Sequence, residues 1–353
     1  MGSKIVERVL AQSGCPGLAD FLVSALSASD LQSLLMHVYQ RRALQVTDAD
    51  LMRASDRPLL KAADIDARRL NLFDRVAFET ARDFEAIDIS PVSPFGLNQA
   101  LGRIDQNNVL STTRNADVTG DPTAAMAVEC ARRRKTNPAT VRLCNSHRVL
   151  RMQPFDDPNF RPHFRLFSLV TAGRDTGSRQ FEIAALVEHL RFYLQLFRNL
   201  NEVGFVLHQP LVELTDATSI RPLIPEVQDH GGIQAHGIRA HLHGGSERFL
   251  EKHGITLPGA LPDLQYLEDL IQPLQAEFPE GRFRVNSARP EGLNYYNGAM
   301  LRISPLAPDG ERYAIGDGGF TNWTARLLQN RKERLLTSGI GTEFTCRRYW
   351  SGG

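Results

Sequence analysis

Four arginines lie on two expected strands that flank a short polar loop. A guanidinium group presents paired donors that match phosphate and carboxylate oxygens. Two such strands and the loop between them could therefore hold a polyanion, although exposed strand arginines could equally pair with nearby acids. The four are Arg148, Arg151, Arg161 and Arg165, within residues 141–173.

A run rich in histidine, glycine and proline is a second group that could bind a ligand. Neutral imidazoles can ligate zinc, but this run contains no cysteine and its spacing does not match a zinc-ligand pattern. A solvated loop is therefore favoured over a metal site. The histidines are His230, His236, His241 and His243.

A basic run at residues 132–135 ends an expected helix that Asp121 caps and Pro122 begins. Basic side chains at this end complement the negative pole of the helix dipole, which is a sufficient structural reason for the run. Contact with tRNA or phosphate is the alternative.

Periodicity predicts a helical N-terminal region followed by a mixed core. Apolar residues recur at helical spacing over 18–38, with Ser29 or Asp30 as the N-cap between two helices. Further helices are expected at 72–84, 182–200, 264–278 and 323–336, and antiparallel strands at 283–286, 298–303 and 312–315, with a turn at 316–319.

The composition is typical of a soluble globular protein with a net charge near zero. The 353 residues include 41 Lys and Arg and 40 Asp and Glu, so bulk charge gives no argument for a nucleic acid or an anionic membrane as partner. The four cysteines form no CxxC pair, which favours reduced thiols in the cytoplasm. No apolar run is long enough to span a bilayer, and the N-terminus lacks a signal sequence.

Separated stretches, taken in order, resemble the catalytic core of class II aminoacyl-tRNA synthetases. Residues 118–125 (VTGDPTAA) resemble that family's Leu-Arg-Pro-Glu/Asp-x-Thr-Ala-Ala segment. His147-Arg148 resembles the Phe-Arg of motif 2, and residues 292–298 (GLNYYNG) resemble Gly-Leu-Asp-Tyr-Tyr-Thr-Gly. The likeness covers about residues 70–345 and is strongest to histidyl-tRNA synthetase and to the regulatory subunit of ATP phosphoribosyltransferase.

The resemblance implies a nucleotide site on the two arginine-bearing strands. Arg148 would contact the α-phosphate of ATP and the substrate carboxylate, and Phe164 would stack on adenine. Arg151 and, in a motif 3-like end, Arg347 would also bind the nucleotide, with Mg²⁺ bridging the phosphates. An arginine between the attacking carboxylate and the phosphate would relieve their mutual repulsion.

The resemblance also implies an amino-acid pocket beside the nucleotide. In it, the carboxylate of Asp121 would bind the α-ammonium group of the substrate, with Thr123 next to it. The remaining expected pocket residues are Glu291, Tyr295 and Tyr296.

Departures from the family pattern concern the substrate half of the site. Glu291 stands where histidyl enzymes carry an arginine, and Arg289, two residues earlier, could substitute as the catalytic cation. Thr119 replaces the arginine of the Leu-Arg-Pro segment. Leu166 and Val170 replace polar residues on the second motif 2 strand, which argues against histidine as the ligand.

The expected fold class is α+β, a class II synthetase-like antiparallel sheet flanked by helices, with an N-terminal helical region and a small insertion. The expected units are the helical region at 1–70, a core with motifs 1 and 2 at 71–215, the insertion at 216–281 and the rest of the core at 282–353. Motif 1, at residues 89–94, implies a homodimer. Because the sequence stops where an anticodon-binding domain would begin, tRNA charging is not expected.

Three functions compete. The first, which we favour, is ATP-dependent activation of an amino acid or similar small carboxylate as an adenylate by a ligase. The second is a catalytically silent regulatory or ligand-binding paralogue that acts through a partner protein. The third is RNA binding through the basic run, and the near-zero net charge counts against it. The identity of the carboxylate and of its acceptor stays open.

Overall fold

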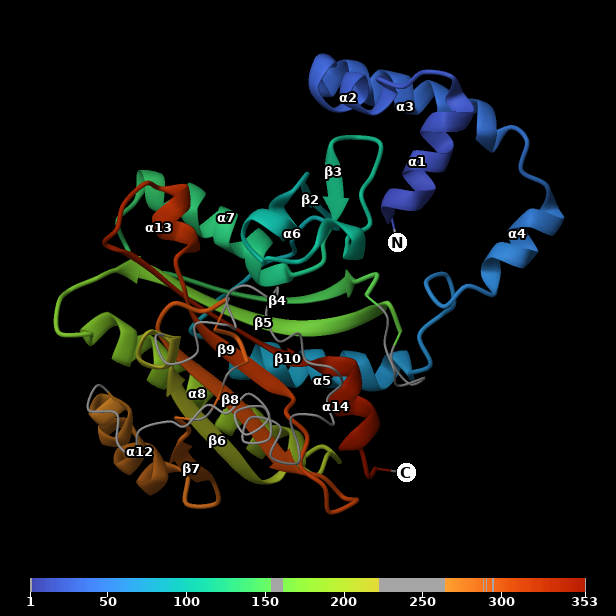
Figure 1. The fold of residues 1–353 in the computed structure, drawn as a ribbon. Helices are drawn as coiled ribbons and strands as arrows, with labels where there is room; N and C mark the ends of the chain where they lie inside the picture. Colours follow the sequence, from blue (N-terminus) through green and yellow to red (C-terminus); the bar gives the residue numbers. More distant parts are fainter. Residues whose placement is uncertain are drawn as a thin grey trace, which may run out of the picture.

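An eight-stranded sheet runs through the described part of the chain in the order β1-β4-β5-β10-β9-β8-β6-β7 (Figure 1). The central pairs are antiparallel, and the two outermost pairs, β1 with β4 and β6 with β7, are parallel. The strands are β1 (Glu85–Ala86), β4 (Val141–Leu150), β5 (His163–Arg174), β6 (His208–Asp216), β7 (Arg282–Val285), β8 (Ala299–Leu306), β9 (Gly316–Thr321) and β10 (Glu333–Gly341).

The computed structural model describes residues 2–153, 161–221, 264–287, 289, 291–293 and 295–352. The four histidines of the predicted solvated loop lie outside these residues. A small antiparallel pair, β2 (Val92–Pro94) and β3 (Ala116–Val118), includes the end of the motif 1-like segment. The expected α+β fold, a sheet flanked by helices, is confirmed.

Helices cover both faces of the sheet. On one side, the α8 face, lie α5 (Ala67–Thr80), α8 (Gln180–Asn201) and α14 (Thr342–Arg348). On the other, the α7 face, lie α7 (Pro122–Thr136) and α13 (Trp323–Leu327). Shorter or more peripheral elements are α6 (Leu97–Ala100), η2 (Gln106–Asn108), α9 (Ala217–Ile220) and α12 (Gln265–Glu277).

Strand alternation assigns each side chain of the sheet to one of these two faces. On β4, Cys144 joins the apolar core under α5 and α8, while its neighbour Leu143 joins the core under α7. On β5, Leu169 and Val170 divide in the same way. A shift of one residue therefore moves a side chain to the opposite side of the sheet.

The C-terminal end of α7 uses its basic residues within the molecule. Arg132 and Arg133 both pair with Glu129. Arg134 is buried and forms two hydrogen bonds to Glu333 of β10, at 2.5 and 3.0 Å. Three of the four basic side chains are thus engaged by acids, which weakens the RNA-binding hypothesis.

The N-terminal helices extend away from the sheet (Figure 1). Here Ser27, not the predicted Ser29 or Asp30, caps the long helix by accepting a hydrogen bond from the amide of Asp30. No described side chain between residues 4 and 60 is buried. The elements are α1 (Gly2–Ser13), α2 (Leu18–Asp20), the π-helix η1 (Phe21–Ala25), α3 (Ala28–Ala43) and α4 (Asp48–Ser55).

Three expectations for the C-terminal part are wrong. The expected strand at 312–315 is absent from the described chain, and the expected turn at 316–319 is instead the start of β9. The expected helix at 323–336 ends at Leu327, and its second half belongs to β10. In the part of the chain that the structure describes, no helix is long and apolar enough to cross a membrane.

Candidate functional site

Asp121 and Tyr295 form the first element of the site, on the α7 face. Asp121 caps α7, and its Oδ1 accepts hydrogen bonds from the amide and hydroxyl of Thr123, at 2.9 and 2.7 Å. The Tyr295 hydroxyl donates to Oδ2 of Asp121 at 2.7 Å. Burial raises the pKa of Tyr295, so its proton stays on the phenol. The structure therefore brings three expected substrate residues together around one carboxylate.

Arg151 adjoins this carboxylate, and Phe164 adjoins Arg151. The Arg151 Nε donates to the carbonyl of Gly120 at 2.8 Å, and Nη2 lies 4.0 Å from Oδ2 of Asp121. The guanidinium lies over the Phe164 ring, 5.5 Å from its centroid. Of the expected nucleotide residues, the partly exposed Arg151 thus lies beside the expected ammonium-binding carboxylate, and Phe164 lies under its guanidinium.

The ring of Tyr296 packs directly against the backbone of β9. A Cβ atom at Gly319 would lie 2.7 Å from the Tyr296 ring, so only glycine permits this close approach. The rings of Tyr295 and Tyr296 meet edge to face at 4.7 Å between centroids, and Trp323 of α13 packs against Tyr295 at 5.0 Å. Three aromatic side chains therefore pack together here, and Tyr296 rests on the bare backbone of β9.

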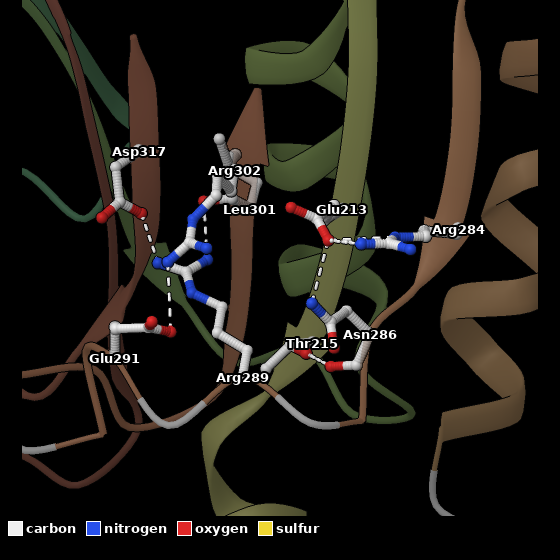
Figure 2. Close-up of polar contacts among 9 residues, drawn as sticks. All are labelled: Glu213, Thr215, Arg284, Asn286, Arg289, Glu291, Leu301, Arg302 and Asp317. Atoms are coloured by element: carbon white, nitrogen blue, oxygen red, sulfur yellow. Dashed lines mark hydrogen bonds and ion pairs between the residues drawn. The ribbon is translucent and has the colours of Figure 1, made fainter. Parts of the chain in front are cut away.

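A group of charged side chains occupies the neighbouring part of the same face (Figure 2). Arg289 is fully buried, donates to Asp317 at 2.7 Å and donates to the carbonyl of Leu301 at 3.1 Å. Arg302 of β8 donates to Glu291 at 3.2 Å. Glu291, which the sequence comparison aligned with an arginine of histidyl-tRNA synthetases, is thus paired with an arginine of β8.

Arg148 points to the opposite side of the sheet. Its Nη2 lies 2.5 Å from Glu343 of α14, and its Nη1 lies 3.0 Å from Nδ1 of His163. Ser146, two residues earlier on the same strand, donates to Asp74 of α5, which places both side chains on the α8 face. The structure therefore does not bring Arg148 to Asp121, and its predicted phosphate contact stays a prediction.

Arg347 is likewise not placed with the Asp121 group. It lies on α14, and the described contacts of that helix are with α5, β5 and β10. His147 takes the position on the α7 face that the motif 2 comparison gave to Arg148. Burial lowers the pKa of His147, which favours the neutral imidazole.

Arg302 was not singled out from the sequence, and His147 was matched only to the phenylalanine of motif 2, not proposed as a site residue. Counting back by twos from Arg151 along an unbroken strand would have indicated His147. Arg302 had no comparable local signal, because its partner Glu291 lies across a loop.

The described residues contain no group of three or more His, Cys, Asp or Glu side chains arranged to hold a metal ion. Mg²⁺ is commonly held by one or two carboxylates together with the phosphates of a nucleotide.

No protein-family model matches this chain, and no curated protein matches it. Solved structures do. A histidine–tRNA ligase subunit from Alicyclobacillus acidocaldarius superimposes with a TM-score of 0.57 and 13% identity, over 82% of this chain and 95% of that chain. The fold is that of class II aminoacyl-tRNA synthetases.

Two further structures agree on this fold. An ATP phosphoribosyltransferase regulatory subunit/histidyl-tRNA synthetase from Bacillus halodurans has a TM-score of 0.57 and 13% identity over 79% of each chain. Histidyl-tRNA synthetase from Nostoc has a TM-score of 0.54 and 16% identity over 81% of this chain and 72% of that chain. At such identities the likeness concerns the fold, and the chemistry must be argued from the side chains.

Proposed function

We propose that this protein binds ATP and an amino acid or similar small carboxylate on the α7 face and joins them as an adenylate. One observation carries the proposal: the Asp121–Tyr295 pair lies next to the Arg151–Phe164 pair. A carboxylate that can hold an ammonium group, 4.0 Å from a partly exposed guanidinium over an aromatic ring, suits an amino acid beside a nucleotide.

The chemistry requires two anions to meet. The ligand carboxylate attacks the α-phosphorus of ATP, the acyl-phosphate bond forms, and pyrophosphate leaves with the electron pair of the broken P–O bond. Arg151 supplies positive charge where the anions repel each other, and Phe164 offers a surface for the base. Mg²⁺ bound to the phosphates would share the charge neutralisation.

The second candidate is a catalytically silent ligand-binding or regulatory protein that acts through a partner protein. It is favoured by the engagement of two expected catalytic cations, Arg148 with Glu343 and Arg289 with Asp317. Neither guanidinium is then free to neutralise the negative charge that develops on a phosphate during catalysis. In both candidates the motif 1-like segment at 89–94 forms a homodimer in the cytoplasm, and tRNA is not a partner.

Pyrophosphate exchange against a panel of amino acids tests the choice. We expect exchange with at least one amino acid, and we expect Arg151→Ala to reduce its rate by about 100-fold or more. Binding of ATP and amino acid without exchange would support the silent paralogue. The absence of both exchange and binding would exclude both candidates.

The matched control is Arg142→Ala. Arg142 lies on the same strand as the motif 2-like residues but pairs with Glu188 at the exposed far end. Its removal should leave exchange unchanged. Arg148→Ala is a further test. An effect as large as that of Arg151→Ala would assign the phosphate contact to Arg148, which would then have to leave its ion pair with Glu343 when ATP binds.

A further inference from the structure

Two buried guanidinium groups, those of Arg289 and Arg302, lie together on the α7 face (Figure 2). Arg289 has no exposed surface, and only 5% of Arg302 is exposed. Burial, and then the charge of Arg289, lower the pKa of Arg302. Burying two like charges together is costly unless anions and hydrogen-bond acceptors surround them.

The described residues do not supply enough acceptors for this pair. Each guanidinium carries five N–H donors. Arg289 uses Nη1 for the Leu301 carbonyl and Nη2 for Asp317, and its buried Nε has no partner among the described residues. Within the same described set, Arg302 makes a single hydrogen bond, the 3.2 Å contact from Nη2 to Glu291. Donors are therefore in excess.

The nearby acids do not remove this excess. Asp317 is paired with Arg289, but its side chain is 54% exposed, so water screens its charge. Glu213, which faces Arg302 across the β6–β8 pair, accepts hydrogen bonds from Arg284 and Asn286 through its Oε1. The charge of Asp317 is therefore screened by water, and Glu213 is engaged by Arg284 and Asn286, so neither acid neutralises the arginine pair fully.

The position of the pair relative to the rest of the site indicates which part of a ligand it would meet. An ammonium group at Asp121 lies beside Arg151, so the α-carboxylate of the same ligand falls on the Arg151 side. Tyr296 adjoins both clusters. On one side its ring meets Tyr295, which donates to Asp121. On the other it packs on Gly319, two residues along β9 from Asp317, the partner of Arg289. A side chain passing Tyr296 would reach the two arginines.

We propose that Arg289 and Arg302 bind a side-chain carboxylate, so that the substrate class is the α-amino dicarboxylic acids. This inference rests on the proposed function and specifies its substrate. Arg302 supplies the donors that Glu291 leaves unused, and the ligand carboxylate completes the hydrogen bonding of the two guanidinium groups. Glu291 competes with the ligand for Arg302.

Calorimetric titration of the full-length protein with L-aspartate, L-glutamate, L-asparagine and L-glutamine tests this assignment. One of the two acids should bind about tenfold or more tighter than its amide, the value expected for charge-assisted hydrogen bonds. Arg302→Gln should reduce that ratio to about one. The control Arg284→Gln, which removes a more exposed arginine that pairs with Glu213, should leave the ratio unchanged.

A second variant covers the case in which Arg302→Gln fails to fold. Glu291→Gln removes the competing carboxylate and should tighten binding of the acid while leaving binding of the amide unchanged. Equal binding of acids and amides to the wild-type protein, or tightest binding of a neutral amino acid, overturns the inference but leaves the proposed function standing. Failure of every amino acid in the wider exchange panel to bind would instead overturn the proposed function.

Discussion

His189 makes the stability of this protein depend on pH in a calculable way. It is fully buried on α8, between Ser338 of β10 and Thr171 of β5. Tyr193 donates to Ser338, and Thr171 donates to Glu188, so the imidazole accepts from Ser338 at Nδ1 and donates to Thr171 from Nε2. This chain of donors fits the neutral imidazole, and burial lowers the pKa of His189 to about 3.

The direction of the pH dependence follows from whether the folded or the unfolded state binds the proton more tightly. An unfolded histidine takes up a proton below a pH of about 6.5, whereas His189 in the folded protein does so only near its lowered pKa. The stability that comes from keeping His189 neutral is therefore fully present above the pKa of histidine in the unfolded chain, and it is lost as the pH falls toward 3. Between pH 7 and pH 5 the loss from this one residue is about 2 kcal/mol.

Urea unfolding followed by circular dichroism at pH 7 and pH 5 measures this loss. His189→Gln retains an amide that can donate to one neighbour and accept from the other, but it cannot titrate. The variant should be less stable at pH 7 and should lose about 2 kcal/mol less than the wild type between the two pH values. Equal losses in the two proteins would refute the assignment of the pH dependence to His189.

Three further predictions concern the scaffold. Arg134→Ala should lower the free energy of unfolding by about 3–5 kcal/mol in urea titrations, because it leaves a buried carboxylate unpaired, whereas Arg132→Ala at an exposed pair should have a much smaller effect. Gly319→Ala should cost about 1–3 kcal/mol, because the new methyl group would overlap a buried tyrosine ring, and Gly339→Ala, whose nearest neighbour is at 3.5 Å, should be tolerated. Removal of residues 2–55 should leave the melting temperature of the remainder within about 2 °C, because none of the described side chains removed is buried; a larger drop would show that these helices stabilise the core.

Local patterns predicted the strongly periodic helices well. The apolar spacing over 182–200 corresponds to α8, and the expected cap at Asp121 is observed. The C-terminal strands were mispredicted for a tertiary reason. Gly318 and Gly319 looked like a turn, but they lie inside β9, where added Cβ atoms would collide with Ser338 and Tyr296. Glycine there permits close approach and does not terminate the strand.

The site was predictable in part. The residues around Asp121 come from segments that resemble family motifs, so their meeting with Tyr295 was expected, although nothing local in the sequence sets the distance between them. The face on which Arg148 lies changes if the strand is shifted by one residue. The sequence pattern indicates a strand there but does not fix which residues point to which face. The pairing of Arg302 with Glu291 depends on how a loop folds back on β8, and no short-range pattern encodes it.

Calorimetric titration with MgATP tests the central claim most directly, namely that the Arg151–Phe164 pair beside Asp121 forms a nucleotide site. Wild-type protein should bind one equivalent, Arg151→Ala and Phe164→Ala should each weaken binding by about tenfold or more, and Arg142→Ala should bind like the wild type. Absence of binding to the wild type, or unchanged binding in both site variants, would contradict the account.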